Sequence, residues 1–332
     1  MTVFEKLKNE LVTTQYTWLI TGVAGFIGSH LLEILLQLNQ KVIGLDNFST
    51  GFRHNLDDVL AKITPALQRN FIFYEGDICR LEDCQKAVAG VDYVLHQAAL
   101  GSVSRSIETP AATNATNVTG FLHMLMAAKE AKVKRFVYAS SSSVYGDSPV
   151  LPKTESHMGH PLSPYAVSKY TNELYAKTFA NCYGMESIGL RYFNIFGPRQ
   201  NKQGPYAAVI PLWITSLLKD EPIYINGDGL TSRDFCYVDN AVEANLLAAT
   251  VTDKAAVNQV YNITIGEQTT LNTLFAFIAR HLNREKQPCY RDFRNGDIRH
   301  SLADIRQAKK LLGYSASVPV AIGLKKTIDW FC

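Results

Sequence analysis

The chain has 332 residues, of which 47% are hydrophobic and 19% charged, and its formal net charge is +3. Such a composition is typical of a globular protein that is large enough for a substantial buried core. The small net charge excludes the strongly basic surface of a nucleic-acid-binding protein, and polar residues interrupt the apolar stretches before they reach the length of a membrane span.

The N-terminal residues 1–16 have an amphipathic helical pattern, since Phe4, Leu7 and Leu11 alternate with charged side chains. We expect them to form a helical extension rather than the apolar segment of a secretory signal. The six cysteines include no CxxC pair, so we expect reduced thiols in the cytoplasm and no metal site.

Strand-like and helix-like segments alternate from residue 17 to residue 192. This alternation predicts βαβ units, and therefore a Rossmann-like α/β fold with a doubly wound parallel sheet. The predicted strands are 17–21, 41–45, 71–75, 92–96, 135–140 and 187–192, and the predicted helices are 26–38, 81–88, 111–131 and 165–183.

Beyond residue 192 the loops lengthen and turn residues cluster, at 201–205 and again at 226–229. We interpret residues 193–332 as a smaller region, interleaved with the first, that completes a cleft over the carboxyl ends of the strands. Doubly wound sheets bind their ligands at this edge, so we expect the smaller region to bind the substrate.

Three glycines, Gly22, Gly25 and Gly28, follow the first predicted strand and open a helix. Glycines in such a turn let the backbone approach a pyrophosphate, and the helix N-terminus offers free N–H groups. Their GxxGxxG spacing departs from the common GxGxxG, and a tight turn without a ligand is the alternative. Asp46 ends the second strand, where a carboxylate accepts hydrogen bonds from a ribose diol and repels a 2′-phosphate. Together they predict that residues 17–192 bind NAD rather than NADP.

The segment Ser163-Pro164-Tyr165-Ala-Val-Ser-Lys169 combines a helix start with two reactive side chains. Ser163 can cap a helix and Pro164 suits its first turn. Tyr165 and Lys169 then lie four residues apart on one helical face. A tyrosine with an unperturbed pKa of about 10 is a poor base at neutral pH. A neighbouring ammonium and a positive nicotinamide ring would stabilise the phenolate, so we predict Tyr165 as the base and Lys169 as its partner.

Four serines, 140–143, stand at the end of the fifth predicted strand, where parallel sheets place their chemistry. A hydroxyl there can hydrogen-bond the substrate oxygen that gains or loses a proton. We favour Ser141, with Ser142 and Ser143 lining the same pocket, and the choice among them stays open. A structural turn between strand and loop is the alternative.

The motifs GVAGFIGS, LDNFSTG, GDI, HQAALGSV, SSSSVYG, SPYAVSKY, RYFNIFGPRQ and SRDFCYVDN occur in this order over nearly the whole chain. In this set the chain resembles the extended short-chain dehydrogenase/reductases, and among them the bacterial UDP-N-acetylglucosamine 4-epimerases of surface-polysaccharide pathways. The resemblance implies an NAD held through the catalytic cycle, with Tyr165 as base, Lys169 on the nicotinamide ribose and Ser141 on the proton path.

The predicted cofactor contacts come from the glycine turn, from strand ends and from the catalytic helix. Asp77 and Ile78 would reach the adenine, with an ordinary turn aspartate as the alternative for Asp77. By resemblance, residues 96–99 would pass along the cofactor and Asn117 would support its site. The full set is Gly22, Gly25, Phe26, Ile27, Gly28, Asp46, Asn47, Asp77, Ile78, Gln97, Ala98, Ala99, Asn117, Tyr165, Lys169 and Tyr192.

The reaction implied by the resemblance is epimerisation at C4, by oxidation of the sugar, rotation of the 4-keto sugar and reduction from its other face. Related dehydratases carry Asp-Glu directly after the hydroxyl residue and related decarboxylases a nearby glutamate, whereas Ser142 and Ser143 stand here. Elimination therefore lacks its acid and base. Ser104 replaces a proline that close relatives carry, which leaves the roles of Ser102 and Arg105 open.

The resemblance also places a UDP-sugar. Two arginines would anchor its diphosphate, a role suited to guanidinium groups, and a salt bridge is the alternative for each. Ser301 stands where an epimerase restricted to plain hexoses carries a bulky aromatic, so it would leave room for a 2-N-acetyl group; a small residue kept for packing is the alternative. The predicted contacts to the nucleotide and diphosphate are Asn194 at the diphosphate–sugar, Ala208 and Val209 along the nucleotide, Tyr224 and Asn226 at the uracil, Arg233 and Arg294 at the diphosphate, and Asp297 at the ribose. Core packing is the alternative for Tyr224. The other predicted substrate contacts are Ser102, Ser141, Ser142, Ser143, Tyr165 and Ser301, with Ser301 at the sugar.

The preferred interpretation is the interconversion of UDP-GlcNAc and UDP-GalNAc. A 4-epimerase of UDP-N-acetylglucosaminuronate or UDP-glucuronate is the first alternative, because Arg105 or Arg299 would suit a C6 carboxylate. A catalytically inactive NAD-binding regulatory protein is the second, although the intact Tyr165 and Lys169 argue against it. By family analogy we expect a homodimer through the helices predicted at 111–131 and 165–183.

Overall fold

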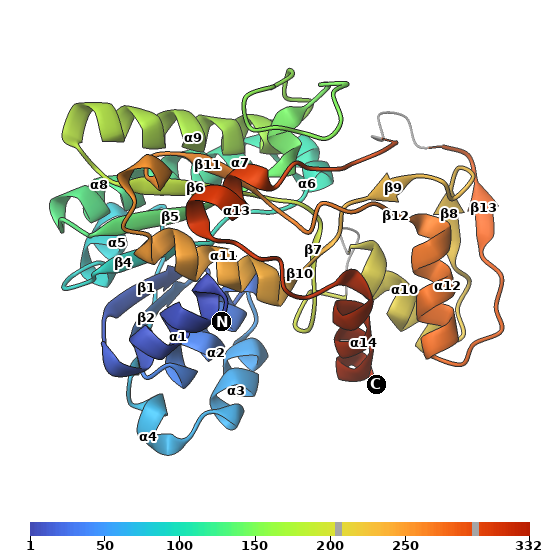
Figure 1. Ribbon diagram of the computed structural model, residues 1–332, viewed down its shortest axis with the longest axis horizontal. Helices are drawn as coiled ribbons and strands as arrows, with labels where there is room; N and C mark the ends of the chain where they lie inside the picture. The colour runs from blue at the N-terminus through green and yellow to red at the C-terminus, as the bar shows by residue number, and fades with distance from the viewer. Residues whose placement is uncertain (203–207, 294–298) are drawn as a thin grey trace.

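A parallel sheet of seven strands forms the centre of the computed structural model, which describes residues 1–202, 208–293 and 299–332 (Figure 1). Its strand order is β11-β6-β5-β4-β1-β2-β3, so the chain starts in the middle, winds outward to β3 and then builds the other half. This order confirms the predicted Rossmann-like, doubly wound sheet. The strands are β1 (Thr17–Thr21), β2 (Lys41–Asp46), β3 (Phe71–Glu75), β4 (Tyr93–His96), β5 (Arg135–Ser141), β6 (Ser187–Tyr192) and β11 (Val260–Ile263).

Helices cover both faces of the sheet, which is why its strands are apolar on both sides. In β1 the side chains of Trp18 and Ile20 enter the core shared with α2 and α11, whereas Leu19 between them enters the opposite core, shared with α8 and α9. The first face carries α1 (Val3–Thr13), α2 (Phe26–Gln37), α3 (Arg53–Lys62), α11 (Val238–Thr250) and α13 (Arg306–Leu312), and the second α5 (Leu81–Ala87), α8 (Phe121–Glu130) and α9 (Pro164–Tyr183) (Figure 1).

A smaller lobe stands beside the sheet (Figure 1). Ile214, Leu274 and Leu324 belong to its own apolar core, to which α10, α12 and α14 contribute. Short two-stranded ladders frame it: β8 pairs with β13, β7 with β10, and β9 with β12. Its elements are β7 (Ile195–Phe196), α10 (Val209–Leu218), β8 (Tyr224–Asn226), β9 (Ser232–Arg233), β10 (Cys236–Tyr237), β12 (Thr269–Thr270), α12 (Leu271–His281), β13 (Cys289–Arg291) and α14 (Val320–Phe331).

The six predicted strands are all present, three of them with the predicted bounds 17–21, 71–75 and 187–192. The seventh strand, β11, is a finding of the structure, because four residues among long loops carry no clear strand signal. Since α11 and β11 come from beyond residue 192, that part of the chain contributes to the large sheet as well as to the smaller lobe. Across the described ranges, no helix combines the length and apolar character that a bilayer span requires.

The single helix predicted at 111–131 is interrupted. A π-helical turn, Ala115–Gly120, separates α7 (Pro110–Asn114) from α8. In this turn the Asn117 side chain binds both backbone groups of Leu100 and the hydroxyl of Ser168. Wide turns of this kind are frequent at functional sites, and a periodicity of apolar residues does not reveal them. Further short elements are α4 (Pro65–Gln68), α6 (Val103–Glu108) and two 3₁₀ turns, Ser142–Tyr145 and Lys254–Ala256.

Candidate active site

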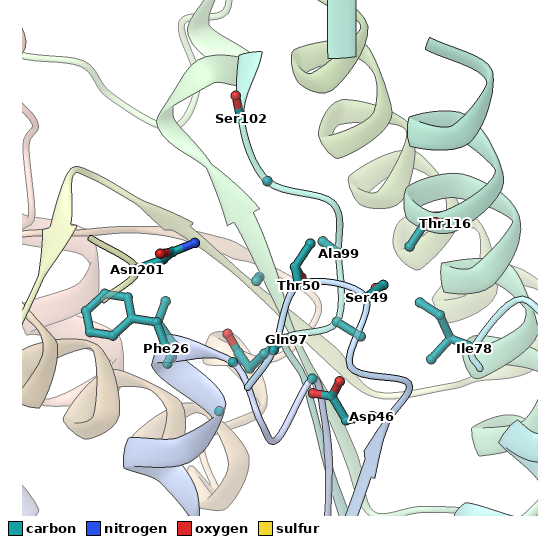
Figure 2. A pocket seen from close by; sticks show the side chains of 18 of the residues that line it. Phe26, Asp46, Ser49, Thr50, Ile78, Gln97, Ala99, Ser102, Thr116 and Asn201 are labelled. Atoms are coloured by element: carbon teal, nitrogen blue, oxygen red, sulfur yellow. The ribbon is translucent and has the colours of Figure 1, made fainter. Parts of the chain in front are cut away.

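A cleft of about 710 Å³ opens at the carboxyl ends of β1, β2, β4, β5 and β6, where doubly wound sheets bind their ligands. Figure 2 shows Phe26 and Asn201 on one side of it and Ile78 and Thr116 on the other, with Asp46 between them. The structure brings together here the predicted cofactor residues Gly22, Gly25, Phe26, Ile27, Gly28, Asp46, Asn47, Asp77, Ile78, Gln97, Ala98, Ala99, Tyr165, Lys169 and Tyr192.

The glycine turn has no room for a side chain at Gly22 or Gly28. Gly22 has a φ of +70°, and a Cβ there would lie 2.8 Å from the backbone nitrogen of Ala98. A Cβ at Gly28 would lie 2.1 Å from the carbonyl oxygen of Gly22. Gly25 begins α2 without a side-chain cap, so the first N–H groups of this helix are available at the cleft. The turn therefore fits the pyrophosphate of a dinucleotide.

Asp46 lies in the cleft and binds the backbone of the loops on either side of it (Figure 2). Its carboxylate accepts hydrogen bonds from the backbone nitrogens of Ala24, at 2.9 Å, and Phe48, at 2.8 Å. Burial raises the pKa of this carboxyl, and the backbone hydrogen bonds oppose that rise. The backbone of Asn47 is a third donor to this carboxylate. Because an ionised carboxylate has about four acceptor positions, one remains for the ribose diol predicted from the sequence.

Tyr165 and Lys169 lie one turn apart on α9. The Lys169 side chain is only 3% exposed, and its Nζ lies 6.0 Å from the centroid of the Tyr165 ring. Burial raises the pKa of Tyr165, which a hydrogen bond from Ser141 opposes, and burial lowers the pKa of Lys169 to about 8. The expected lowering of the Tyr165 pKa by Lys169 together with a positive nicotinamide ring stays a prediction.

Of the four serines 140–143, two line the cleft and two belong to the turn that follows. Ser140 and Ser141 line the cleft, whereas Ser142 and Ser143 lie in the following 3₁₀ turn and off its wall. The backbone nitrogen of Ser143 donates to Ser141 Oγ at 3.2 Å, which leaves the Ser141 proton for another acceptor. Of the serines, Ser141 is the one that opposes the rise in the pKa of Tyr165, while its part in the reaction stays a prediction.

A ring of hydrogen bonds connects two residues of the cleft wall, Gln97 and Tyr192, with Asn245 outside it. Tyr192 donates to Gln97 at 3.1 Å, Gln97 donates to Asn245 at 3.0 Å, and Asn245 donates to Tyr192 at 2.7 Å, which closes a ring of hydrogen bonds. Asn245 lies on α11 and had no sequence signal. Asn117, expected near the cofactor, is buried outside the cleft wall, where it supports the loop at Leu100.

The predicted substrate residues are not gathered in one place. Ser102 and Asn194 line the cleft, whereas the described ones from beyond residue 207 stand outside its wall. Tyr224 is stacked under the guanidinium of Arg291, whose Cζ lies 3.2 Å from the ring centroid. Arg233 donates to the backbone oxygen of Ser232 at 3.0 Å. The remaining members of this outer group are Ala208, Val209, Asn226 and Ser301, while Arg294 and Asp297 lie outside the described residues.

The structure adds residues to the cleft that were not predicted. Ser49 and Thr50 follow Asp46 closely in the chain and face the cleft beside it (Figure 2). A polar turn directly after a strand end was the signal that could have identified them. Further additions come from the start of α3, from the π-helical turn and from the loop after β7, among them Phe52, Asn55, Thr116, Arg199, Gln200 and Asn201.

A parallel doubly wound sheet, a glycine turn at a helix start and a tyrosine–lysine pair in the same cleft define a dinucleotide-dependent α/β enzyme. Residues 18–264 match the sequence model of the NAD dependent epimerase/dehydratase family, and the chain belongs to this family. The glycine turn and Asp46 fit NAD, the cofactor of the family.

Comparison with individual proteins gives matches over nearly the full length. A putative UDP-glucose 4-epimerase of Methanocaldococcus jannaschii is 36% identical, over 94% of this chain and 97% of its own. A UDP-N-acetylglucosamine 4-epimerase of Methanobrevibacter ruminantium, solved with UDP-N-acetylmuramic acid, has a TM-score of 0.87 at 38% identity and covers 96% of this chain and 98% of its own. A UDP-glucuronic acid 4-epimerase of Bacillus cereus, solved with a fluorinated UDP-glucuronic acid and NAD, has a TM-score of 0.85 at 29% identity, over 95% and 98%.

Proposed function

We propose that the protein interconverts UDP-GlcNAc and UDP-GalNAc with NAD as its cofactor. The observation that carries this proposal is the meeting of Tyr165, Lys169 and Ser141 at the end of β5, in the same cleft as the glycine turn. The relatives named above are described as UDP-sugar 4-epimerases, which supports both the C4 reaction and the UDP-sugar.

The chain's own residues move one proton in each half of the reaction. Bound NAD supplies the acceptor and then the donor of the hydride at C4. Tyr165 takes the proton of the 4-hydroxyl as the hydride leaves C4, and it returns this proton when the 4-keto sugar is reduced from its other face. Ser141 donates a hydrogen bond to the oxygen that loses and regains this proton, and Lys169 would bind the nicotinamide ribose. Both proton and hydride return to the sugar, so epimerisation consumes no oxidant.

Elimination is disfavoured by the distribution of acids. Among the described residues of the cleft wall, the carboxylates are those of Asp46 and Asp77, at the ends of β2 and β3. With a spacing of about 4.8 Å between strands, β2 lies about 14 Å from β5, where Tyr165 meets Ser141. Neither acid can reach the sugar carbons that Tyr165 serves, so oxidation and reduction at C4 remain.

The N-acetyl group is the finer part of the proposal. Ser301 is small and partly buried, and its backbone nitrogen donates to the backbone oxygen of Ser232 at 3.1 Å, next to Arg233. A serine leaves space there for a 2-N-acetyl group. A C6 carboxylate is the second candidate, because Arg105 lines the cleft beside Ser102. The guanidinium of Arg299 is paired with Asp228 at 2.7 Å, which makes it the weaker of the two arginine candidates.

One experiment tests the proposal. The purified protein is incubated separately with UDP-GlcNAc, UDP-GlcNAcA, UDP-Glc and UDP-GlcA, and the products are identified by NMR. We expect conversion of UDP-GlcNAc to be fastest and Tyr165→Phe to lose about 10³-fold in rate. Faster conversion of either uronate would favour the second candidate. Cofactor absorbance without any conversion would favour the regulatory protein.

We also propose a homodimer in the cytoplasm. On α9 the side chains of Val167 and Leu174 are 52% and 50% exposed, and on neighbouring α6 Ile107 is 63% exposed. Apolar side chains grouped on two adjoining helices are typical of an interface between subunits. The cysteines are free, which suits a reducing compartment, and fractionation of cells would test the location.

A further inference from the structure

A buried carboxylate lies directly behind the catalytic pair. Glu173 stands on α9 four residues after Lys169 and eight after Tyr165, so the three side chains share one face of the helix. Its side chain is 8% exposed. The carboxylate accepts a hydrogen bond from Ser140 Oγ at 2.5 Å and two from Arg191, from Nε at 2.9 Å and from Nη2 at 2.7 Å.

The partners of Glu173 are the chain neighbours of cleft residues. Ser140 precedes Ser141 at the end of β5, and Arg191 precedes Tyr192 at the end of β6. One carboxylate therefore connects the catalytic helix with the ends of two adjacent strands. On β5 and β6 its partner stands next to a residue of the cleft, and on α9 Glu173 itself lies one turn after Lys169.

Arg191 is in turn fixed by groups on its other side. Its Nη1 donates to the hydroxyl of Tyr145 at 2.9 Å and to the backbone oxygen of Glu155 at 3.1 Å. Tyr145 donates to Asn262 on β11 at 2.6 Å. Because each of these groups is engaged, the guanidinium has little freedom to shift, and neither has the Glu173 carboxylate that it holds.

Stability alone is a weak reason for this buried ion pair. Removing two charges from water costs free energy that well-packed apolar side chains would not cost. The opposite ends of β5 and β6 are already joined by Arg135 and Glu186, whose side chains meet at 2.8 Å. A second pair is therefore not needed to keep these strands together, and its position beneath the cleft calls for another explanation.

We propose that Glu173 is a positioning residue of the C4 reaction, which sets Ser140, and through it Ser141, at the place where the Ser141 hydroxyl reaches Tyr165. This inference rests on the proposed function for its kinetic part only. The hydroxyl of Ser141 accepts from Ser143, so its proton is free to be donated to the Tyr165 oxygen. That hydrogen bond is the influence that opposes the burial-driven rise in the pKa of Tyr165. A displaced Ser141 would leave the rise unopposed.

The experiment compares Ser140→Ala and Glu173→Gln with two matched controls. Ser140→Ala removes the hydroxyl but leaves the ion pair with Arg191, so it is the variant expected to fold normally. Glu186→Gln breaks the corresponding pair at the far end of the same strands. Thr327→Val deletes an equally buried hydroxyl, which donates to Gly323 at 2.7 Å in α14.

Two readouts report on Tyr165. The first is the pH dependence of kcat with UDP-GlcNAc. The second is the titration of the Tyr165 ring in NAD-loaded protein labelled with [¹³Cζ]tyrosine, with its signal assigned from Tyr165→Phe. For Ser140→Ala and Glu173→Gln we expect kcat at pH 7 to fall about 10- to 100-fold, KM to stay within about twofold, and the Tyr165 titration to move up by about one pH unit. The two controls should move neither the titration nor kcat.

The outcomes separate a positioning role from a structural one. If both variants lose thermal stability like the controls while the Tyr165 titration and kcat stay at the parental values, Glu173 is structural and the proposal is wrong. If the parent converts no UDP-sugar, the proposed function fails, yet the NMR titration still decides whether Glu173 acts on Tyr165. If Glu173→Gln does not fold, the result with Ser140→Ala stands alone and decides the matter.

Discussion

The ammonium group of Lys169 donates a hydrogen bond to the carbonyl oxygen of Ala139 at 2.8 Å, which connects α9 to the end of β5. The charge is almost completely enclosed, since 3% of the side chain is exposed. Burial of a cation with one neutral partner is unfavourable, and it lowers the pKa of Lys169 from 10.5 to about 8. The site therefore keeps a charged group where it reduces the stability of the fold.

Replacing Lys169 with methionine should increase stability at pH 7 while it abolishes epimerisation. The pKa of Lys169 is lower in the folded chain, so the cost of its charge is fully present below pH 8 and fades as the pH rises toward 10.5. A shift of this size corresponds to about 3 kcal/mol, reduced by the lost hydrogen bond to Ala139, so we expect a gain of about 1 to 3 kcal/mol. Urea unfolding at pH 7 and at pH 10 measures it, and the gain should be smaller at pH 10.

The exposed Lys177 on the same helix provides the control for this change. Lys177→Met should leave both the free energy of unfolding and the turnover near the parental values. A Lys169→Met protein that is less stable than the parent at both pH values would show that the buried ammonium is well compensated, contrary to our account.

Asp46→Asn should weaken both NAD binding and the fold. The two carboxylate oxygens of Asp46 accept from two different backbone nitrogens, those of Ala24 and Phe48. An amide can accept from only one of them and faces the other with its own NH₂ group, at a cost of about 1 to 3 kcal/mol. Because Ala24 belongs to the glycine turn, we expect the Kd for NAD to rise at least about tenfold, as measured by isothermal titration calorimetry.

The matched control is Asp57→Asn, on the exposed side of α3 in the same part of the fold. It removes one negative charge without touching the turn, so NAD affinity and thermal stability should be unchanged. An Asp46→Asn protein with parental NAD affinity would mean that the carboxylate serves the turn alone and not the ribose.

Most strands and helices of the large sheet could be predicted from the sequence because local patterns mark them. A strand such as 17–21 is apolar at its centre, and the start of α9 is marked by Ser163, whose Oγ accepts from Ala166 at 3.1 Å. Local patterns of this kind do not depend on what packs against them. The strand β11 and the π-helical turn at 115–120 depend on distant partners instead, on β6 and on Leu100, so no local pattern announces them.

In the candidate site, too, the parts encoded by local spacing were predictable and those that depend on distant residues were not. The glycine turn and the Tyr165–Lys169 pair occupy the positions that their spacing implied. The rise that burial causes in the pKa of Tyr165 could not be predicted, because burial is a property of the folded surroundings and not of the YxxxK spacing. Likewise Asn245, which completes the hydrogen-bonded ring with Gln97, lies 148 residues away in the chain and could be found only in the structure.

Ser301→Tyr should change substrate preference. If Ser301 leaves the space for the N-acetyl group, a phenol ring there should abolish turnover of UDP-GlcNAc and spare UDP-glucose. The ratio of kcat/KM values for the two sugars is the measurement. Ser301→Ala, which keeps the space, should leave this ratio unchanged. An unaltered ratio in the tyrosine variant would place the selecting residue elsewhere in the smaller lobe.

The exposed apolar side chains of α9 give the last prediction, which concerns the homodimer. Val167 and Leu174 lie seven residues apart on one face and are 52% and 50% exposed. Lysine at both positions would bury two charges per subunit in a subunit interface, so the double variant should sediment near the 36.9 kDa of one chain while the parent sediments at twice that mass. The control is Ile72→Lys, at the edge strand β3, where the isoleucine is 64% exposed but stands apart from α9.

A double variant that stays dimeric would place the interface elsewhere, and a parent that sediments as a single chain would contradict the homodimer. Because Tyr165 and Lys169 share α9 with these side chains, turnover of the monomeric variant would also show whether the active site needs the second subunit.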